Sequence, residues 1–172
     1  MRGCSCRIRN CWRNEKGYRE QGLNKMKRFL ITIASVVLVA VLSFMIIVPQ
    51  MNDNIAKKVA EDILSVPMPE DTTYIESKSL AGKLVGNGNG MQYLGAILIR
   101  SGLELDTLQA YYSSYADNEW TYIVEPQLDN KINVIEHGYL DFDSDINGDG
   151  YFIVYSWGDT DSIIAYLDIR GH

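Results

Sequence analysis

The longest apolar pattern in the chain is the run FLITIASVVLVAVLSFMIIV at residues 29–48, which contains no charged side chain. A helix of that length spans about 30 Å, which matches the hydrocarbon core of a lipid bilayer. Apolar side chains surround this helix on every side, whereas a surface helix of a soluble protein keeps a polar face. The run therefore predicts one transmembrane helix in contact with membrane lipid, and Pro49 is expected to end or kink it at the membrane boundary.

Two other interpretations of this run are weaker. A buried helix of a soluble protein rarely continues so long without a charge. A cleaved signal peptide has a shorter apolar core, and a cleavage site between small residues follows that core closely. No such site follows residue 48, and no cysteine stands there for lipoprotein processing. An uncleaved anchor is the interpretation that fits best.

The charges on the two sides of the run are strongly asymmetric. Residues 1–28 carry nine Lys or Arg and two Glu, a net charge of +7, whereas residues 49–172 carry seven basic and 20 acidic residues, a net charge of −13. Short segments rich in Lys and Arg stay in the cytoplasm. We therefore expect a plasma-membrane protein with a cytoplasmic N-terminus and an extracytoplasmic acidic part. That acidity also argues against a nucleic-acid partner, because phosphates would be repelled.

The basic segment, residues 1–28, is expected to be a cytoplasmic tail. Residues 26–28 would by themselves make a compact basic start, so residues 1–25 are either a genuine tail or the product of a start codon assigned too early. All three cysteines lie in this tail: Cys4, Cys6 and Cys11. A zinc site needs four ligands and the tail has no histidine, so reduced thiols are expected there. Residues 49–172 have no cysteine and must fold without disulfides.

Beyond Pro49, residues 52–65 place Ile55, Val59 and Ile63 four apart, which predicts a short amphipathic helix. Asn52 or Asp53 is available as its N-cap. This helix is expected either to lie on the membrane or to dock on the following domain. The stretch VPMPED at 66–71 stops it, because two prolines two apart favour an extended spacer.

From residue 72 the pattern changes to strands. Residues 72–86 and 91–100 read as strands joined by the glycine-rich turn 86–90, and 91–100 is apolar on both faces, as in the centre of a sheet. Ser101 and Glu104 stand in capping-box register before a helix expected to reach about Ala116. Four further strands are expected at 121–125, 133–142, 151–157 and 162–169. The fold class is α+β: a two-layer domain at 72–172 whose antiparallel or mixed sheet is covered by one or two helices.

The acid-rich segment 141–152 is the most suggestive chemical feature. Asp143, Asp145, Asn147 and Asp149 alternate as the oxygen ligands of a calcium loop do. The bidentate Glu that closes such a loop is absent, and strands rather than helices are expected on both sides. We therefore favour a β-hairpin turn without bound metal, in which the Asn-Gly and Asp-Gly steps supply positive φ angles. A weak calcium site is the alternative.

Three further features have ordinary structural explanations. The glycine-rich segment 86–90 leads into a strand, not into the helix N-terminus that a phosphate loop requires. His137 and His172 are the only histidines, and no nucleophile motif accompanies them. Finally, aromatic side chains alternate with an isoleucine on one strand face as a sugar- or peptide-binding platform would, although core packing is the better interpretation. This stripe consists of Tyr151, Ile153, Tyr155 and Trp157.

A set of short motifs carries a resemblance to known proteins. They are Pro67-x-Pro69, Ala81-Gly82-Lys83, Gly88-Asn89-Gly90-Met91-x-Tyr93, Leu108 to Tyr112, Tyr155-Ser156-Trp157-Gly158 and Leu167-Asp168-Ile169-Arg170-Gly171-His172. With them the chain resembles small, single-pass hypothetical proteins of low-GC Gram-positive bacteria, from the anchor through the exported domain. The resemblance implies a place in the cell envelope. It implies no activity and no site residues.

The functional expectation is a non-catalytic module, anchored in the membrane, that binds another envelope protein or a wall component and needs no cofactor. A calcium-dependent sensor or adhesion module that uses the Asp143–Asp149 loop is an alternative. An envelope hydrolase that uses carboxylates or His137 is the least favoured class.

Overall fold

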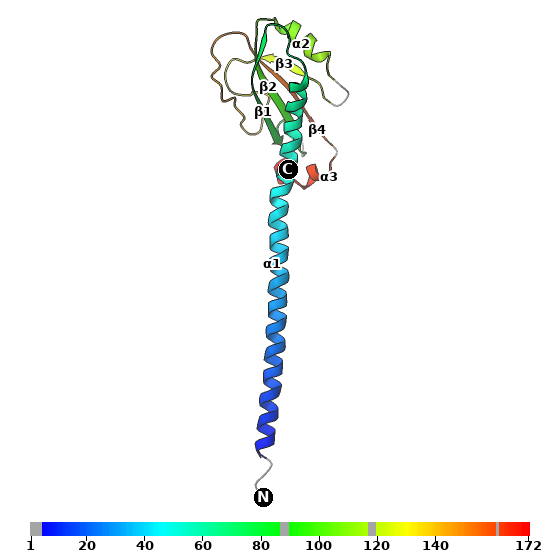
Figure 1. Ribbon diagram of the computed structural model, residues 1–172, viewed down its shortest axis with the longest axis vertical. Helices are drawn as coiled ribbons and strands as arrows, with labels where there is room; N and C mark the ends of the chain where they lie inside the picture. Colours follow the sequence, from blue (N-terminus) through cyan, green and yellow to red (C-terminus); the bar gives the residue numbers. More distant parts are fainter. Residues whose placement is uncertain (1–4, 87–89, 117–119, 161) are drawn as a thin grey trace. The chain divides into compact units, whose positions relative to one another are not determined.

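The computed structural model describes residues 5–86, 90–116, 120–160 and 162–172, with side chains from residue 22 onward. The chain divides into two units, residues 1–45 and residues 46–172. Figure 1 shows the helices and strands of both. Helix α1 (Ser5–Ser65) begins inside the basic tail and contains the apolar run.

The apolar run is helical as predicted, and its side chains at residues 29–47 are exposed. Among the described residues, one helix is long and apolar enough to cross a membrane, and it is this helix near the N-terminus. A core helix of a soluble protein would be mostly buried, so this exposure favours a membrane anchor or a signal sequence.

Pro49 was expected to end or kink the helix; it lies inside α1, so an end of the helix at this residue is wrong. Proline lacks the N–H that would bond to the carbonyl one turn earlier, but its fixed φ angle is compatible with a helix. Residues 52–65 are therefore the last turns of α1, and Asn52 is a buried helix-interior residue rather than an N-cap.

The second unit is built on an antiparallel sheet, which confirms the α+β class. Its four strands have the order β1-β2-β4-β3. The strands are β1 (Thr72–Gly82), β2 (Gln92–Ser101), β3 (Ile123–Pro126) and β4 (Tyr151–Asp159). The predicted central position of the apolar strand is confirmed, because β2 pairs with β1 on one side and with β4 on the other.

One face of the sheet is covered by helices. The last turns of α1 and helix α2 (Leu105–Ser113) pack against alternate residues of β2. This first core includes Ala56, Val59, Ile63, Tyr93, Ile97, Ile99, Leu108, Tyr112 and Val154. The amphipathic stripe was expected either on the membrane or on the domain, and in the structure it docks on the domain.

The other face is covered by an irregular segment, residues 127–150, that connects β3 to β4. Its side chains meet the remaining residues of β2 and β4 in a second core. This core includes Leu94, Ala96, Leu98, Ile132, Ile135, Phe142, Ile153 and Tyr155. β2 is thus apolar on both faces because both faces are covered.

Two predicted strands are wrong. Residues 133–142 contain no strand and make an isolated bridge, Lys131 with Asp141. Gly138 has a φ of +105°, and the N–H groups of Glu136 and His137 both donate to the Leu84 carbonyl, which is not a ladder pattern. Residues 162–169 instead form helix α3 (Ile163–Leu167) and the start of the 3₁₀ helix η1 (Ile169–Gly171), because the Ser162 hydroxyl accepts from the Ile164 N–H.

The predicted capping box before α2 is also wrong. The N-cap is Glu104, without a side-chain cap bond, and α2 ends at Ser113 rather than near Ala116. Ser101 belongs to β2, where its hydroxyl bonds to the Thr72 hydroxyl and accepts from the Leu103 N–H. The Ser101 hydroxyl is therefore already hydrogen-bonded within the connection between β2 and α2 and does not cap the helix.

Candidate functional site

The strongest candidate site is a hollow at the end of the sheet where β1 begins and β2 ends. It has a volume of about 350 Å³, which lies within the usual range of ligand pockets, about 300–1,000 Å³. Its lining is mostly polar: Asp71, Thr73, Arg100, Ser101, Gly102 and Asp149. We call it the distal hollow.

Backbone pairing holds the distal hollow together. Thr73 is paired with Arg100 across β1 and β2. The Ser101 N–H donates to the Gly150 carbonyl (2.8 Å), and the Gly102 N–H donates to the Asp71 carbonyl (3.1 Å). Three segments far apart in the sequence therefore meet at one point.

Two features of the distal hollow are typical of binding sites. Asp71 has a φ of +53°, a left-handed conformation that is uncommon for residues other than glycine. The Arg100 guanidinium lies 5.5 Å from the centre of the Tyr151 ring, within cation–π distance, while remaining exposed. An arginine that lines the same hollow as Asp71 and Asp149 offers both signs of charge to a polar ligand.

Of the four predicted metal ligands, Asp149 lines the distal hollow and Asp143 lies elsewhere. The Asp143 carboxylate pairs with Lys78 (2.7 Å), and its N–H donates to the Glu76 carboxylate (2.6 Å). Lys78 and Thr73 are five residues apart on β1, which corresponds to roughly 15 Å along a strand. Asp143 and Asp149 thus contact well-separated points of the sheet. Across the described residues, no group of three or more His, Cys, Asp or Glu could hold a metal ion.

The predicted hairpin around this segment does not form, because residues 133–142 are not a strand. The expected backbone conformation is nevertheless present: Gly148 and Gly150 have φ angles of +92° and +86°. The Asn-Gly and Asp-Gly steps therefore make turns within the irregular segment rather than the tip of a hairpin. Asp145 and Asn147 lie in sequence between Asp143, which pairs with Lys78, and Asp149, which lines the distal hollow, and they are not among the residues that line the hollow.

We expect millimolar calcium to leave the melting temperature of the protein unchanged. Lys78 already neutralises Asp143, and the oxygens of a calcium site must converge within about 2.5 Å of one ion. Thermal unfolding with and without calcium measures this, with magnesium as the control. A calcium-specific rise that the double variant Asp145→Ala, Asp149→Ala abolishes would contradict the expectation.

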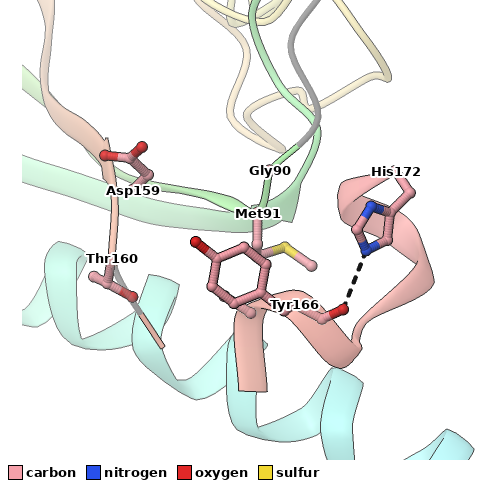
Figure 2. A pocket seen from close by; sticks show the side chains of 7 residues that line it. Gly90, Met91, Asp159, Thr160, Tyr166 and His172 are labelled. Atoms are coloured by element: carbon pink, nitrogen blue, oxygen red, sulfur yellow. Dashed lines mark hydrogen bonds between the residues drawn. The ribbon is translucent and has the colours of Figure 1, made fainter. Parts of the chain in front are cut away.

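A second, smaller pocket lies beside α3 and η1 (Figure 2). Its volume is about 150 Å³, below the usual range for small-molecule sites. It is lined by Gly90, Met91, Asp159, Thr160, Ala165, Tyr166 and His172. The His172 Nε2 lies 3.1 Å from the Tyr166 carbonyl, so a backbone acceptor occupies this ring nitrogen. The pocket has room for a small side chain or a few waters.

The remaining sequence candidates have structural roles. His137 Nε2 donates to the Gly86 carbonyl (2.8 Å), and the Gly86 N–H donates to the Glu136 carboxylate (2.8 Å), which would repel a phosphate. Residues 87–89 of the glycine-rich segment lie outside the described part of the chain. Tyr155 is buried and donates to Glu125 (2.9 Å), with the pKa of its hydroxyl raised by burial and then by that contact.

The stripe with Tyr155 is packing rather than a platform. Ile153 and Tyr155 belong to the second core, and Tyr151 packs against it. Trp157 is partly exposed at the end of the stripe. The interpretation as core packing is confirmed for the first three residues.

A buried polar cluster joins α1 to the C-terminal segment of the second unit. The Asn52 side chain donates to the Asp168 carboxylate (2.8 Å) and accepts from the Tyr93 hydroxyl (2.8 Å). Arg170 donates to both Asp168 oxygens and, on the α1 side, to the Pro49 carbonyl (3.0 Å). We call Asn52, Tyr93, Asp168 and Arg170 the junction cluster.

The charge states of Asp168 and Arg170 favour this cluster. Burial alone would raise the pKa of the Asp168 carboxyl, but hydrogen bonds from Arg170, Asn52 and the Arg170 backbone, together with the guanidinium charge, lower it to about 2. Hydrogen bonding to Asp168 raises the pKa of Arg170. Both groups are therefore charged under ordinary conditions, and the cluster is a permanent structural contact rather than a pH switch.

Sequence reasoning missed most of these residues. Asn52 was expected as a cap, yet it stands four residues before Ala56 on the buried stripe, and a polar residue on such a stripe signals a buried bond. Arg100 ends an otherwise apolar strand, which marks it as an exposed charge at a sheet end. Arg170 is a local partner of Asp168, two residues away, but its other partner, Asn52, is 116 residues away. The Asp71 carbonyl likewise accepts from Gly102, which is distant in sequence.

Comparison with known proteins adds no identification. No protein family, no curated protein and no solved structure matches this chain.

Proposed function

We propose that this chain is a plasma-membrane protein of a bacterial cell envelope, anchored by residues 29–48, with its basic N-terminal segment in the cytoplasm and residues 49–172 outside. There the folded unit binds another envelope protein or a wall component without catalysing a reaction. The observation that carries the proposal is α1, in which one helix holds an exposed, uncharged apolar run and then the stripe that docks on the sheet. The charges of +7 and −13 on the two sides support the orientation.

The distal hollow is the proposed contact site. It lies at the opposite end of β2 from the α3–η1 segment: Gly171 and Arg170 bond to Gly90 and Lys83, whereas Gly150 bonds to Ser101. The ten residues of β2 correspond to about 30 Å between the two ends. A site at that end faces away from residues 49–52, where α1 would leave the membrane, and is open to partners in the envelope.

The chemistry of the distal hollow supports binding rather than catalysis. Its ionisable groups are two carboxylates and a guanidinium, and the histidines lie elsewhere, bonded to backbone carbonyls. An exposed arginine beside an aromatic ring is a frequent anchor in protein interfaces. We therefore propose a partner that presents polar and charged groups, as an envelope protein or a wall peptide does.

Photocrosslinking in intact cells tests this function. A photoreactive amino acid replaces Thr73 at the rim of the distal hollow, and a matched variant carries it at Lys58, which is exposed on α1. We expect a discrete adduct from position 73 that is absent from position 58 and is lost in Arg100→Ala, whose side chain is exposed. Identical labelling from both positions, or no adduct from either, would contradict the proposed site.

In the same cells, stripped of their wall, added protease is expected to digest residues 49–172; protection would contradict the orientation.

A further inference from the structure

Beyond the apolar run, the α3–η1 segment exposes large apolar side chains more densely than any other short stretch of the second unit's described residues. Four of seven consecutive residues are involved: Ile163 (79% exposed), Tyr166 (66%), Leu167 (46%) and Ile169 (74%). We call these four residues the C-terminal patch. Soluble surfaces seldom leave such residues together in water, so a patch of this kind marks a contact with another surface.

The charge of this segment contrasts with that of the domain around it. Residues 49–172 carry a net charge of −13. Residues 162–172 contain one acidic residue, Asp168, and its carboxylate is buried in the junction cluster. The charged side chain that remains partly exposed there is Arg170. Asp53 pairs with Arg170, and Asp159 lines the pocket beside Tyr166, so the nearby carboxylates come from other segments. An apolar segment without an exposed carboxylate of its own, and with a guanidinium at its edge, is compatible with a lipid surface and poorly suited to water.

Hydrogen bonds fix the level of the C-terminal patch along α1. Arg170 donates to the Pro49 carbonyl (3.0 Å), and Asn52 donates to the Ile164 carbonyl (3.4 Å). The patch therefore lies beside residues 49–52. These residues follow directly after Val48, the last residue of the apolar run, and all of them belong to the second unit.

Residues 49–52 cover about 5 Å along a helix axis. The headgroup layer occupies about 5–8 Å on each side of the hydrocarbon core. If residues 29–48 fill the core, the turn of α1 that carries the patch lies at headgroup level. A segment at that level must be covered either by lipid or by protein.

We propose that the C-terminal patch docks on the outer leaflet of the bilayer, with its aliphatic side chains at the boundary between headgroups and acyl chains and Tyr166 at headgroup level. Tyrosine suits that level because its ring is apolar and its hydroxyl is polar. The proposal rests on the proposed anchoring by residues 29–48 and adds a second membrane contact to it. The junction cluster holds this second contact against α1, so that the domain has a fixed height above the membrane.

Lipid-quenching measurements on the full chain test the docking. Cys4, Cys6 and Cys11 are replaced by serine, and a single cysteine carrying an environment-sensitive fluorophore is introduced by Ile163→Cys, Ile169→Cys, Leu128→Cys or Val37→Cys. Leu128 is the matched control: it is 83% exposed, and the neighbouring Gln127 bonds to Tyr151 at the distal end of the sheet. Each protein is reconstituted into phosphatidylcholine–phosphatidylglycerol vesicles that contain lipids with a nitroxide high on the acyl chain, for positions 163 and 169, and lipids with a nitroxide near the chain end, for position 37.

We expect the probes at 163 and 169 to lose most of their emission, as the probe at 37 does, while the probe at 128 keeps its emission. Quenching at 37 with 163 and 169 as bright as 128 would overturn the docking and leave the anchor intact. No quenching at 37 would overturn the anchor and the docking together. A blue shift at 163 and 169 without lipid quenching would show that a second copy of the chain covers the patch, which also overturns lipid docking.

Discussion

Replacing Gly95 with alanine is expected to lower the free energy of unfolding by about 3 kcal/mol, the upper end of the cost of overpacking a core. Gly95 lies in the middle of β2, where α1 crosses the sheet. A Cβ atom at this position would meet the backbone of α1, at 2.6 Å from the Val59 carbonyl carbon and closer still to the Ala60 nitrogen. Backbone atoms of a packed helix have no free rotamer that relieves such a clash, so the helix must move off the sheet.

The neighbours of Gly95 show why this crossing is close. Gly95 is paired with Ser79 on β1 and with Ser156 on β4. Directly opposed residues of antiparallel strands lie on the same face. Three small residues therefore form a row across the sheet, and α1 packs into it.

The control for Gly95→Ala is Gly82→Ala. The nearest atoms to an added Cβ at Gly82 lie 3.8 and 3.9 Å away, which is ordinary contact. Urea unfolding of the full chain in detergent micelles, followed by tryptophan fluorescence, measures both variants. An effect of Gly95→Ala no larger than that of Gly82→Ala would contradict the close crossing. Adding Ala60→Gly should not restore stability, because the clash is with backbone rather than with the Ala60 methyl group.

The sequence predicted those elements whose signal is local and long. The apolar run at 29–48, the two-faced strand at 91–100 and the amphipathic stripe that ends at Ile63 are each ten residues or longer, and their periodicity is unambiguous. Their environments follow directly: β2 is apolar on both faces because helices cover one and residues 127–150 cover the other.

One of the errors falls on a short apolar segment, where periodicity cannot separate strand from helix. Residues 162–169 were predicted as a strand because β-branched and aromatic residues dominate them. They fold as α3 and η1 because Ser162 caps the first helix, Asp168 caps the second, and Asp168 also bonds to Asn52, 116 residues away. That long-range bond is not visible in any local window.

The candidate site likewise separates what local sequence shows from what only long-range contacts create. The acidic segment was singled out from sequence, but the structure groups Asp149 with Asp71 and Arg100 rather than with Asp143. Spacing within a segment predicts a metal loop only if the loop closes on itself, and here its two ends contact different parts of the sheet. The tertiary pairing of three separate segments created the distal hollow.

The variant Asp168→Ala is expected to cost about 3 kcal/mol, because truncating one partner of a buried, hydrogen-bonded ion pair leaves the others without a counter-group. The Asp168 side chain is fully buried, and Asn52 and Arg170 both donate to it. The partly exposed Arg170 can recover some hydration, which keeps the expected cost at the lower end for such pairs. The control is Asp53→Ala, which removes the other carboxylate bonded to Arg170; the Asp53 side chain is 52% exposed, so we expect less than about 1 kcal/mol.

The pH dependence of stability distinguishes a lost charge from a lost shape at this position. In the folded protein the pKa of Asp168 is lowered from 3.8 to about 2. The unfolded chain therefore binds more protons in this interval, so the contribution of Asp168, about 2 kcal/mol, is fully present above pH 4 and is lost as the pH falls toward 2. Urea unfolding of the wild type between pH 5 and pH 2 should show this loss, and Asp168→Asn, which keeps the shape but cannot ionise, should show a shallower slope. Equal slopes for the two proteins would mean that the junction cluster is held by shape and hydrogen bonding alone, without the carboxylate charge.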